Sequence, residues 1–345
     1  MRFLITGGSG YFGGELKRSL LRDGHHCVNM DIQADGDQHP QLISEIVDIT
    51  NQHNLQHVFE KHAPFDAVFH IAAQLQLTRF NRDLFYATNV DATDYLMKNC
   101  IKHGVKNIIY ISSNCVYGKI NNELVAEETS LQPFEEYGKT KVAAEAILKN
   151  YQQQANIIIF RPPTIIGEGR LGVLSIVFDF IRENRRLYII GSGENRYQFI
   201  YSEDLIKACK LAAQYSKSAI FNIGSDQVPS LNELFGNMIN MLASKTRLCH
   251  LPALWTVPAM KLCFRLGISP LGPYQYNMLA NTYIGDTRKI KRELSWQPTK
   301  TNLEILLTAY DYYIQHREKI INNKNLSGHR KMGRGGIISL IKWIS

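Results

Sequence analysis

The chain has 345 residues, of which 45% are hydrophobic, and a formal net charge of +8; this composition suits one large globular unit or two fused lobes. Its six cysteines form no Cys-x-x-Cys pair, which argues against a disulfide framework or a metal site and favours a reducing, cytoplasmic compartment. No apolar run reaches the ~20 residues that span a bilayer, and because a strand pattern begins at once we expect no signal peptide.

The first predicted element is a short buried strand at residues 3–5, and an amphipathic helix follows over residues 15–21. Gly7, Gly10 and Gly13 lie between the two. Without a Cβ, these glycines let the backbone turn tightly and let a pyrophosphate approach it, while the helix N-terminus offers unpaired N–H groups to the anion. The order of strand, glycines and helix therefore predicts a dinucleotide-binding site.

A second apolar stretch at residues 27–30 leads into Asp31, eighteen residues beyond Gly13. A dinucleotide-binding fold places at this point the carboxylate that accepts hydrogen bonds from the adenosine ribose. Asp31 would repel a 2′-phosphate, and residues 27–36 contain no Lys or Arg. We therefore predict that the cofactor is NAD and not NADP.

Strand and helix patterns continue to alternate through the first half of the chain. The apolar runs that predict further buried strands are residues 67–71, 106–111 and 155–160. The intervening stretches that predict helices are residues 51–62, 83–103 and 137–151. This order predicts an α/β Rossmann fold, which is a doubly wound parallel sheet with ligands at the carboxyl ends of its strands.

The alternation weakens after Gly167, where prolines and mixed helix and loop patterns predict a smaller C-terminal substrate-binding lobe. We predict that residues 1–167 and about 196–224 form the NAD-binding domain. Residues 168–195 and 225–317 would form the smaller lobe.

Tyr137 and Lys141 are four residues apart, which places a phenol and an ammonium group on one face of a helix. A neighbouring Lys⁺ and a cationic nicotinamide ring both stabilise a phenolate, which would then take the proton from a substrate hydroxyl while hydride leaves its carbon. Ser112 and Ser113 follow the strand at 106–111 and put hydroxyls at the carboxyl edge of the sheet. A serine there can orient the substrate oxygen for Tyr137.

With these motifs the sequence resembles the extended short-chain dehydrogenases/reductases, in the NAD-dependent epimerase/dehydratase group, over about residues 1–310. The motifs that carry the resemblance are residues 6–13, Asp48-Ile49, residues 70–73, Asn89-Val90, residues 112–118, residues 137–141 and Arg161-Pro162. The resemblance implies that Ser113 is the catalytic hydroxyl, Tyr137 the acid/base, and Lys141 a further contact of the nicotinamide ribose. It also implies a homodimer through the helices near 83–103 and 137–151.

The resemblance adds to the expected cofactor site. Its residues are Gly7, Gly10, Tyr11, Phe12, Gly13, Asp31, Ile32, Asp48, Ile49, Ala72, Ala73, Asn89, Tyr137, Lys141 and Pro163.

The substrate-binding positions depart from the family pattern. Sugar-nucleotide 4,6-dehydratases carry Asp-Glu after the catalytic hydroxyl, whereas this chain has Asn114-Cys115, which argues against dehydration. Thr164 replaces a common Asn. Tyr197 stands where an arginine grips the diphosphate in many relatives, and Arg196 is one residue earlier. We expect these three positions, Thr164, Arg196 and Tyr197, to line the substrate site. The expected substrate is a nucleotide sugar, and the alternative is a sterol or other lipid alcohol, as in the 3β-hydroxysteroid dehydrogenase branch.

Residues 318–345 form a basic tail whose end, residues 337–344, is apolar and contains a Trp. This composition suits peripheral contact with a membrane interface, or packing on the protein's own surface. Two other classes of function are less well supported. A non-catalytic NAD sensor would not need Ser113, Tyr137 and Lys141, and binding of nucleic acid is suggested by net charge alone.

Overall fold

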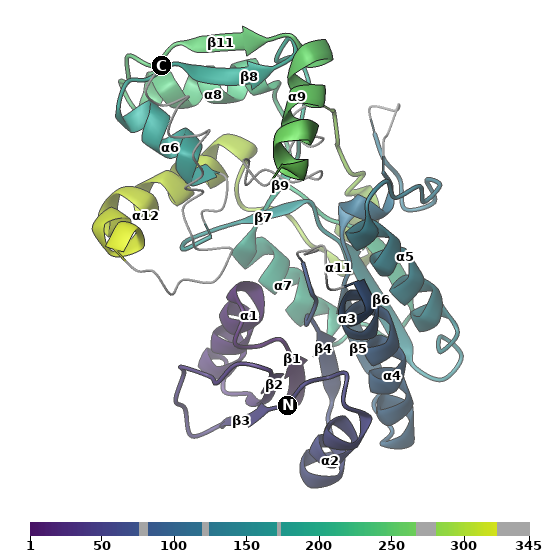
Figure 1. The fold of residues 1–345 in the computed structure, drawn as a ribbon. Helices are drawn as coiled ribbons and strands as arrows, with labels where there is room; N and C mark the ends of the chain where they lie inside the picture. Colours follow the sequence, from purple (N-terminus) through teal and green to yellow (C-terminus); the bar gives the residue numbers. More distant parts are fainter. Residues whose placement is uncertain (76–81, 119–123, 171–173, 267–280, 323–345) are drawn as a thin grey trace.

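The computed structural model describes the chain apart from residues 76–81, 119–123, 171–173, 267–280 and 323–345. The largest element of the described part is a seven-stranded parallel sheet in the order β3-β2-β1-β4-β5-β6-β10 (Figure 1). The strands are β1 (Arg2–Thr6), β2 (His26–Asp31), β3 (Leu42–Ile46), β4 (Ala67–His70), β5 (Asn107–Ile111), β6 (Asn156–Arg161) and β10 (Ala219–Asn222). The predicted Rossmann fold is thereby confirmed. The strand order reverses between β1 and β4, which is where such sheets open a crevice for a ligand.

Alternate residues of each strand point to opposite faces, and helices cover both faces (Figure 1). On one side Phe3 and Ile5 join a core with α1 (Tyr11–Arg22), α7 (Ser202–Ala212) and α11 (Arg288–Leu294). On the other side Leu4 joins α2 (Gln52–His62), α4 (Ala92–Lys102) and α5 (Glu136–Lys149). Burial on both faces explains why the strands read as continuous apolar runs in the sequence.

The helical stretch predicted at 83–103 is not uniform. It consists of α3 (Arg82–Tyr86), the π-helical turn η1 (Ala87–Asp91) and α4. A π-helical turn inside a helix is rare and occurs mostly at functional sites. A short 3₁₀ turn, η2 (Asn114–Val116), follows β5 at the carboxyl edge of the sheet.

The smaller lobe lies at the carboxyl ends of the strands (Figure 1). Its elements are α6 (Leu174–Arg182), β8 (Leu187–Ile190), α8 (Leu231–Met241), β11 (Leu248–Leu251), α9 (Ala253–Arg265) and α12 (Asn302–Asn322). Strand β8 pairs with β11 in parallel, and β7 (Thr164–Ile166) pairs with β9 (Phe199–Tyr201) between the lobe and the large sheet. A third apolar core, from α6, α8 and α12, fills the lobe.

Two boundaries differ from the sequence prediction. Residues 288–296, predicted in the smaller lobe, pack on the large sheet, because Ile290, Leu294 and the fully buried Trp296 belong to the core of α1 and α7. The Trp296 indole Nε1 donates to the Asp204 carbonyl at 2.8 Å. Helix α12 continues to Asn322, beyond the predicted start of the tail at 318. The rest of that tail, residues 323–345, lies outside the described residues. None of the helices that the structure describes has the length and apolarity to cross a bilayer.

Candidate active site

The glycine loop forms a cradle of bare backbone between β1 and α1. Gly7 has φ +76°, a conformation that favours glycine, and a Cβ there would lie 2.8 Å from the Ala72 nitrogen. A Cβ on Gly13 would lie 2.2 Å from the Gly7 carbonyl oxygen. No side chain caps the N-terminus of α1 at Gly10. These features fit the diphosphate of a dinucleotide, which accepts hydrogen bonds from helix N-terminal N–H groups.

Asp31 lies beside this loop at the end of β2. Its carboxylate accepts hydrogen bonds from the backbone N–H groups of Ser9 and Gln33, each at 3.0 Å. The nearby cations of α1 are engaged with other carboxylates: Lys17 with Asp35 and Asp37, and Arg18 with Asp37 and Glu15. A ribose with free hydroxyls therefore meets an acceptor here, whereas a 2′-phosphate would meet negative charge.

A buried chain of hydrogen bonds fixes the loop after β4 against the glycine loop. Thr6 Oγ1 accepts from the N–H groups of Ile71 and Ala72, each at 3.1 Å, so its own proton is donated to His70 Nδ1 at 2.8 Å. His70 Nε2 then donates to Thr93 Oγ1 at 3.0 Å. Burial lowers the pKa of His70 to about 3, with a smaller effect from the Lys141 charge, so the imidazole is neutral.

Asn89, which the family resemblance assigns to the cofactor site, lies in the π-helical turn η1 and is 2% exposed. Its Oδ1 accepts from the Gln74 N–H at 2.8 Å, and its Nδ2 donates to the Gln74 carbonyl at 3.0 Å and to Thr140 Oγ1 at 3.1 Å. Through these bonds Asn89 joins the loop after β4 to helix α5.

The other predicted cofactor residues fall into three groups by exposure. Ile32 and Asp48 are exposed, and Asp48 accepts from the N–H and hydroxyl of Thr50. The buried ones are Tyr11, Phe12, Ile49 and Pro163. Ala72 and Ala73 are half-buried beside the cradle.

The two serines after β5 have different surroundings. Ser112 Oγ donates to Glu145 at 2.6 Å and is part of the core. Ser113 Oγ accepts from the Cys115 N–H at 3.2 Å at the start of η2. Because a Cβ on Gly138 would lie 2.6 Å from the Cys115 carbonyl oxygen, only a glycine lets α5 approach this turn so closely. The structure thus brings the turn that carries Ser113 against the helix that carries Tyr137.

Lys141 lies one helical turn beyond Tyr137 and is 1% exposed. Its Nζ donates to the Tyr110 hydroxyl at 3.0 Å and to the Ile111 carbonyl at 2.9 Å, and lies 5.7 Å from the centroid of the Tyr137 ring. Burial lowers the pKa of Lys141 to about 7, although the Glu145 and Cys115 charges oppose this. The hydrogen bonds to Tyr110 and Ile111 fix two of the three ammonium protons.

The pKa of the Tyr137 phenol is raised, first by burial and then by Cys115 and Glu135, while Arg170 opposes them. The protein alone therefore favours the neutral phenol, and the phenolate expected from the sequence requires further positive charge. Glu135 was not singled out by the sequence analysis. Its Oε1 is buried without a hydrogen-bond partner among the described residues, and burial raises the pKa of its carboxyl.

The three predicted substrate positions lie along the edge of the smaller lobe. Thr164 Oγ1 is 3.5 Å from the Tyr197 hydroxyl, which accepts from Asn114 Nδ2 at 3.1 Å. Tyr197 is 4% exposed, whereas the side chain of Arg196 is exposed to solvent. Tyr283 was not predicted; its ring lies 6.0 Å from that of Tyr197, and its hydroxyl is buried without a partner among the described residues.

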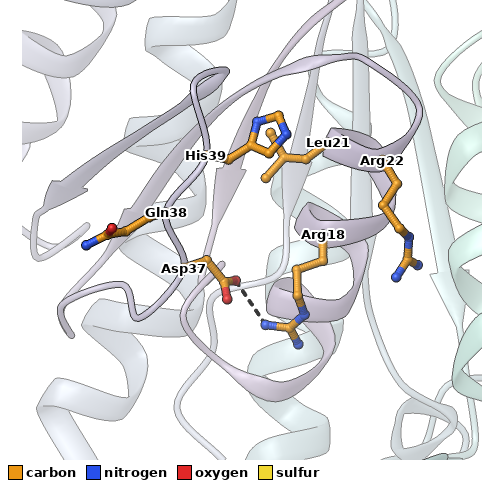
Figure 2. A pocket seen from close by; sticks show the side chains of 6 residues that line it. All are labelled: Arg18, Leu21, Arg22, Asp37, Gln38 and His39. Atoms are coloured by element: carbon orange, nitrogen blue, oxygen red, sulfur yellow. Dashed lines mark hydrogen bonds and ion pairs between the residues drawn. The ribbon is translucent and has the colours of Figure 1, made fainter.

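A separate pocket lies on the outer side of α1 (Figure 2). It is lined by Arg18, Leu21, Arg22, Asp37, Gln38 and His39. The Arg18 guanidinium crosses it to the Asp37 carboxylate at 2.9 Å. No predicted catalytic or cofactor residue lines this pocket, so it is not the candidate active site.

The family model of the NAD-dependent epimerase/dehydratase family matches residues 3–224. The chain belongs to this family, which identifies it as an enzyme with NAD as its cofactor. It is 33% identical over 319 residues to the uncharacterised protein y4nG of Sinorhizobium fredii, covering 92% of this chain and 80% of that protein.

A second relative is the N-acetyl-alpha-D-glucosaminyl-diphospho-ditrans,octacis-undecaprenol 4-epimerase of Escherichia coli O157:H7. It is 28% identical over 288 residues, covering 80% of this chain and 79% of that enzyme. Among solved structures, the UDP-glucose 4-epimerase of Thermotoga maritima with UDP-glucose is similar in fold. The TM-score is 0.74 at 22% identity, covering 92% of this chain and all of that structure.

Proposed function

We propose that the protein interconverts a secondary alcohol and a ketone on a sugar that carries a diphosphate, and that its overall reaction is epimerisation. The observation that carries the proposal is the packing of the Ser113 turn against the helix with Tyr137 and Lys141, at the sheet edge that holds the glycine cradle. The 4-epimerases among the relatives act, by name, on a lipid diphosphate sugar and on a UDP-sugar, and both substrates share the sugar diphosphate.

In this mechanism Ser113 Oγ donates a hydrogen bond to the substrate oxygen and aligns it with the Tyr137 phenol. Tyr137, as phenolate, takes the hydroxyl proton while the electron pair of the O–H bond forms the carbonyl. Lys141 lies 5.7 Å from the Tyr137 ring and supplies positive charge that favours the phenolate. NAD, held by the glycine cradle and Asp31, would supply the hydride acceptor for that carbon and further positive charge for the phenolate. Tyr137 would return its proton to the carbonyl oxygen as hydride is returned to the opposite face of the carbon, which completes an epimerisation.

Dehydration is not part of the proposal. Asn114 stands where a dehydratase carries an acid, and its Nδ2 donates to the Tyr197 hydroxyl at 3.1 Å. Burial raises the pKa of the Cys115 thiol well above its usual value. We also propose a homodimer through α4 and α5, as the family resemblance implies.

Replacement of Tyr137 by Phe tests the proposal. Incubated with NAD and a panel of UDP-sugars, the wild-type protein should convert at least one sugar to its epimer, detected by chromatography. Tyr137→Phe should slow this conversion by about 10²–10⁴-fold, because the proton acceptor is lost. Its NAD affinity, measured by calorimetry, should stay within about threefold, since the phenol hydroxyl is not the main cofactor contact.

Tyr151→Phe is the matched control, because Tyr151 lies just beyond the C-terminal end of α5 and its hydroxyl donates to Asp94 at 2.7 Å. It should retain wild-type turnover. Full activity of Tyr137→Phe would refute the mechanism, and no conversion of any sugar diphosphate by the wild-type protein would refute the substrate class.

A further inference from the structure

Helix α9 lies at the edge of the smaller lobe (Figure 1), and its exposed side chains form an apolar face. Leu254 and Trp255 are each 75% exposed, Leu262 is 57% and Leu266 63% exposed. With Pro258, which is also exposed, these residues follow the spacing of one helix face. The opposite face, with Val257 and Met260, is half-buried against the lobe. An exposed apolar face of this kind marks an interaction site, so the outer face of α9 is suited to a partner.

The charge of this part of the chain indicates the kind of partner. Residues 234–285 contain no Asp or Glu, so all 31 acidic residues of the chain lie outside this stretch. Its charged side chains are Lys and Arg only, and Lys245, Arg247 and Lys261 are exposed. An exposed apolar face with a Trp and neighbouring Lys and Arg side chains complements the interface of an anionic bilayer. A second copy of the chain, with its formal charge of +8, would repel these cations.

We propose that the outer face of α9 docks the enzyme on an anionic lipid bilayer. The proposal concerns the surface of α9 alone and is tested without any substrate.

Co-sedimentation of the full chain with vesicles tests the docking face. The wild-type protein should bind vesicles of phosphatidylglycerol and phosphatidylcholine and bind pure phosphatidylcholine more weakly. The variant Trp255→Glu/Leu262→Glu should lower the partition coefficient at least tenfold, because two exposed apolar side chains become anionic. Met241→Glu is the matched control: Met241 is 65% exposed on α8, outside the α9 face, and its replacement should leave binding unchanged.

Three results would overturn the proposal: no binding by the wild-type protein, equal binding by the α9 variant, or conversion of a wild-type oligomer to a smaller species by that variant in sedimentation velocity. The second result would assign vesicle binding to another segment such as the basic tail, and the third would make α9 a contact between copies. Turnover of a soluble UDP-sugar by the α9 variant should equal that of the wild type and shows that the variant is folded. Failure of all soluble sugars would count against the proposed function without affecting the vesicle result.

Discussion

Glu135 is two residues before Tyr137 and is the buried carboxyl that acts on the proposed acid/base. Its charge raises the pKa of Tyr137, as do burial and Cys115. We predict that Glu135→Gln lowers the pKa of Tyr137, because the neutral amide no longer opposes the phenolate. The rate of the oxidative half-reaction can be followed by NADH absorbance in a single turnover. The rise of this rate with pH should move to lower pH in the variant.

Glu136→Gln provides the comparison for this experiment. The Glu136 carboxylate bonds Lys139 at 2.7 Å and is not among the groups that shift the pKa of Tyr137. Its replacement should leave the pH profile in place. Equal shifts in both variants, or no shift in Glu135→Gln, would contradict a direct effect of Glu135 on the phenol.

His70 makes the stability of the fold depend on pH. Its folded pKa is about 3, against an ordinary value near 6.5, so below pH 6.5 the unfolded chain takes up a proton that the folded protein does not. The contribution of His70 to the free energy of unfolding is fully present above pH 6.5 and decreases as the pH drops. At pH 5 the loss should be about 2 kcal/mol, at ~1.4 kcal/mol per pKa unit.

His70→Gln should remove this part of the pH dependence. A glutamine amide can accept from Thr6 and donate to Thr93, so the buried bonds are kept. Urea unfolding at pH 7 and pH 5 should show a smaller difference in the variant than in the wild type. His53→Gln, at an exposed position of α2, should behave as the wild type; the same difference in all three proteins would show that His70 does not titrate on unfolding.

Among the elements, α5 depends on a glycine for its approach to the catalytic turn. A Cβ at Gly138 would lie 2.6 Å from the Cys115 carbonyl oxygen and 2.8 Å from Pro133 Cβ. We predict that Gly138→Ala costs about 1–3 kcal/mol, as overpacking does, and lowers turnover more than tenfold by moving Tyr137 away from Ser113. Gly36→Ala, where nothing lies within 4 Å of the added Cβ, should change neither quantity. Thermal unfolding and epimer formation measure both; wild-type activity in Gly138→Ala would show that α5 can shift without loss of alignment.

The elements also show what the sequence could predict. Continuous apolar strands and the glycine loop have local patterns, so the parallel sheet and the cofactor cradle were predictable. The position of Trp296 on the large sheet was not, because its contacts with α7 join distant parts of the chain. The effect of Glu135 on Tyr137 was not predictable either, because it depends on the burial of both side chains, which the neighbouring residues in sequence do not reveal. The exposed side of α9 could not be predicted, since both of its faces are apolar.

At the scale of the whole molecule, a buried ionic network joins helix α5 to several strands of the large sheet. Arg161 and Glu145 are each about 1% exposed and form a two-bond ion pair at 2.6 and 3.0 Å. Glu145 also accepts from Ser112, beside the catalytic serine. Arg161 donates to the Tyr117 hydroxyl, which donates to Asn222 at the edge of the sheet. One network therefore connects α5, the last strand β10 and the end of β5 that leads into Ser112 and Ser113, which we call the catalytic strand.

Because both charges are buried, removal of one should cost far more than removal of both. We predict that Glu145→Leu and Arg161→Met each lower the free energy of unfolding by about 3–5 kcal/mol, since each leaves a buried partner uncompensated. The double variant Glu145→Leu/Arg161→Met should cost clearly less than the sum of the single changes, which a urea double-mutant cycle measures. The exposed pair of Lys98 and Asp94, at 2.7 Å, should show a coupling below about 0.5 kcal/mol in the same cycle. Additive costs for Glu145 and Arg161 would mean that the two charges are stabilised separately, by Ser112 and Tyr117, and that no single network holds the catalytic strand to the rest of the molecule.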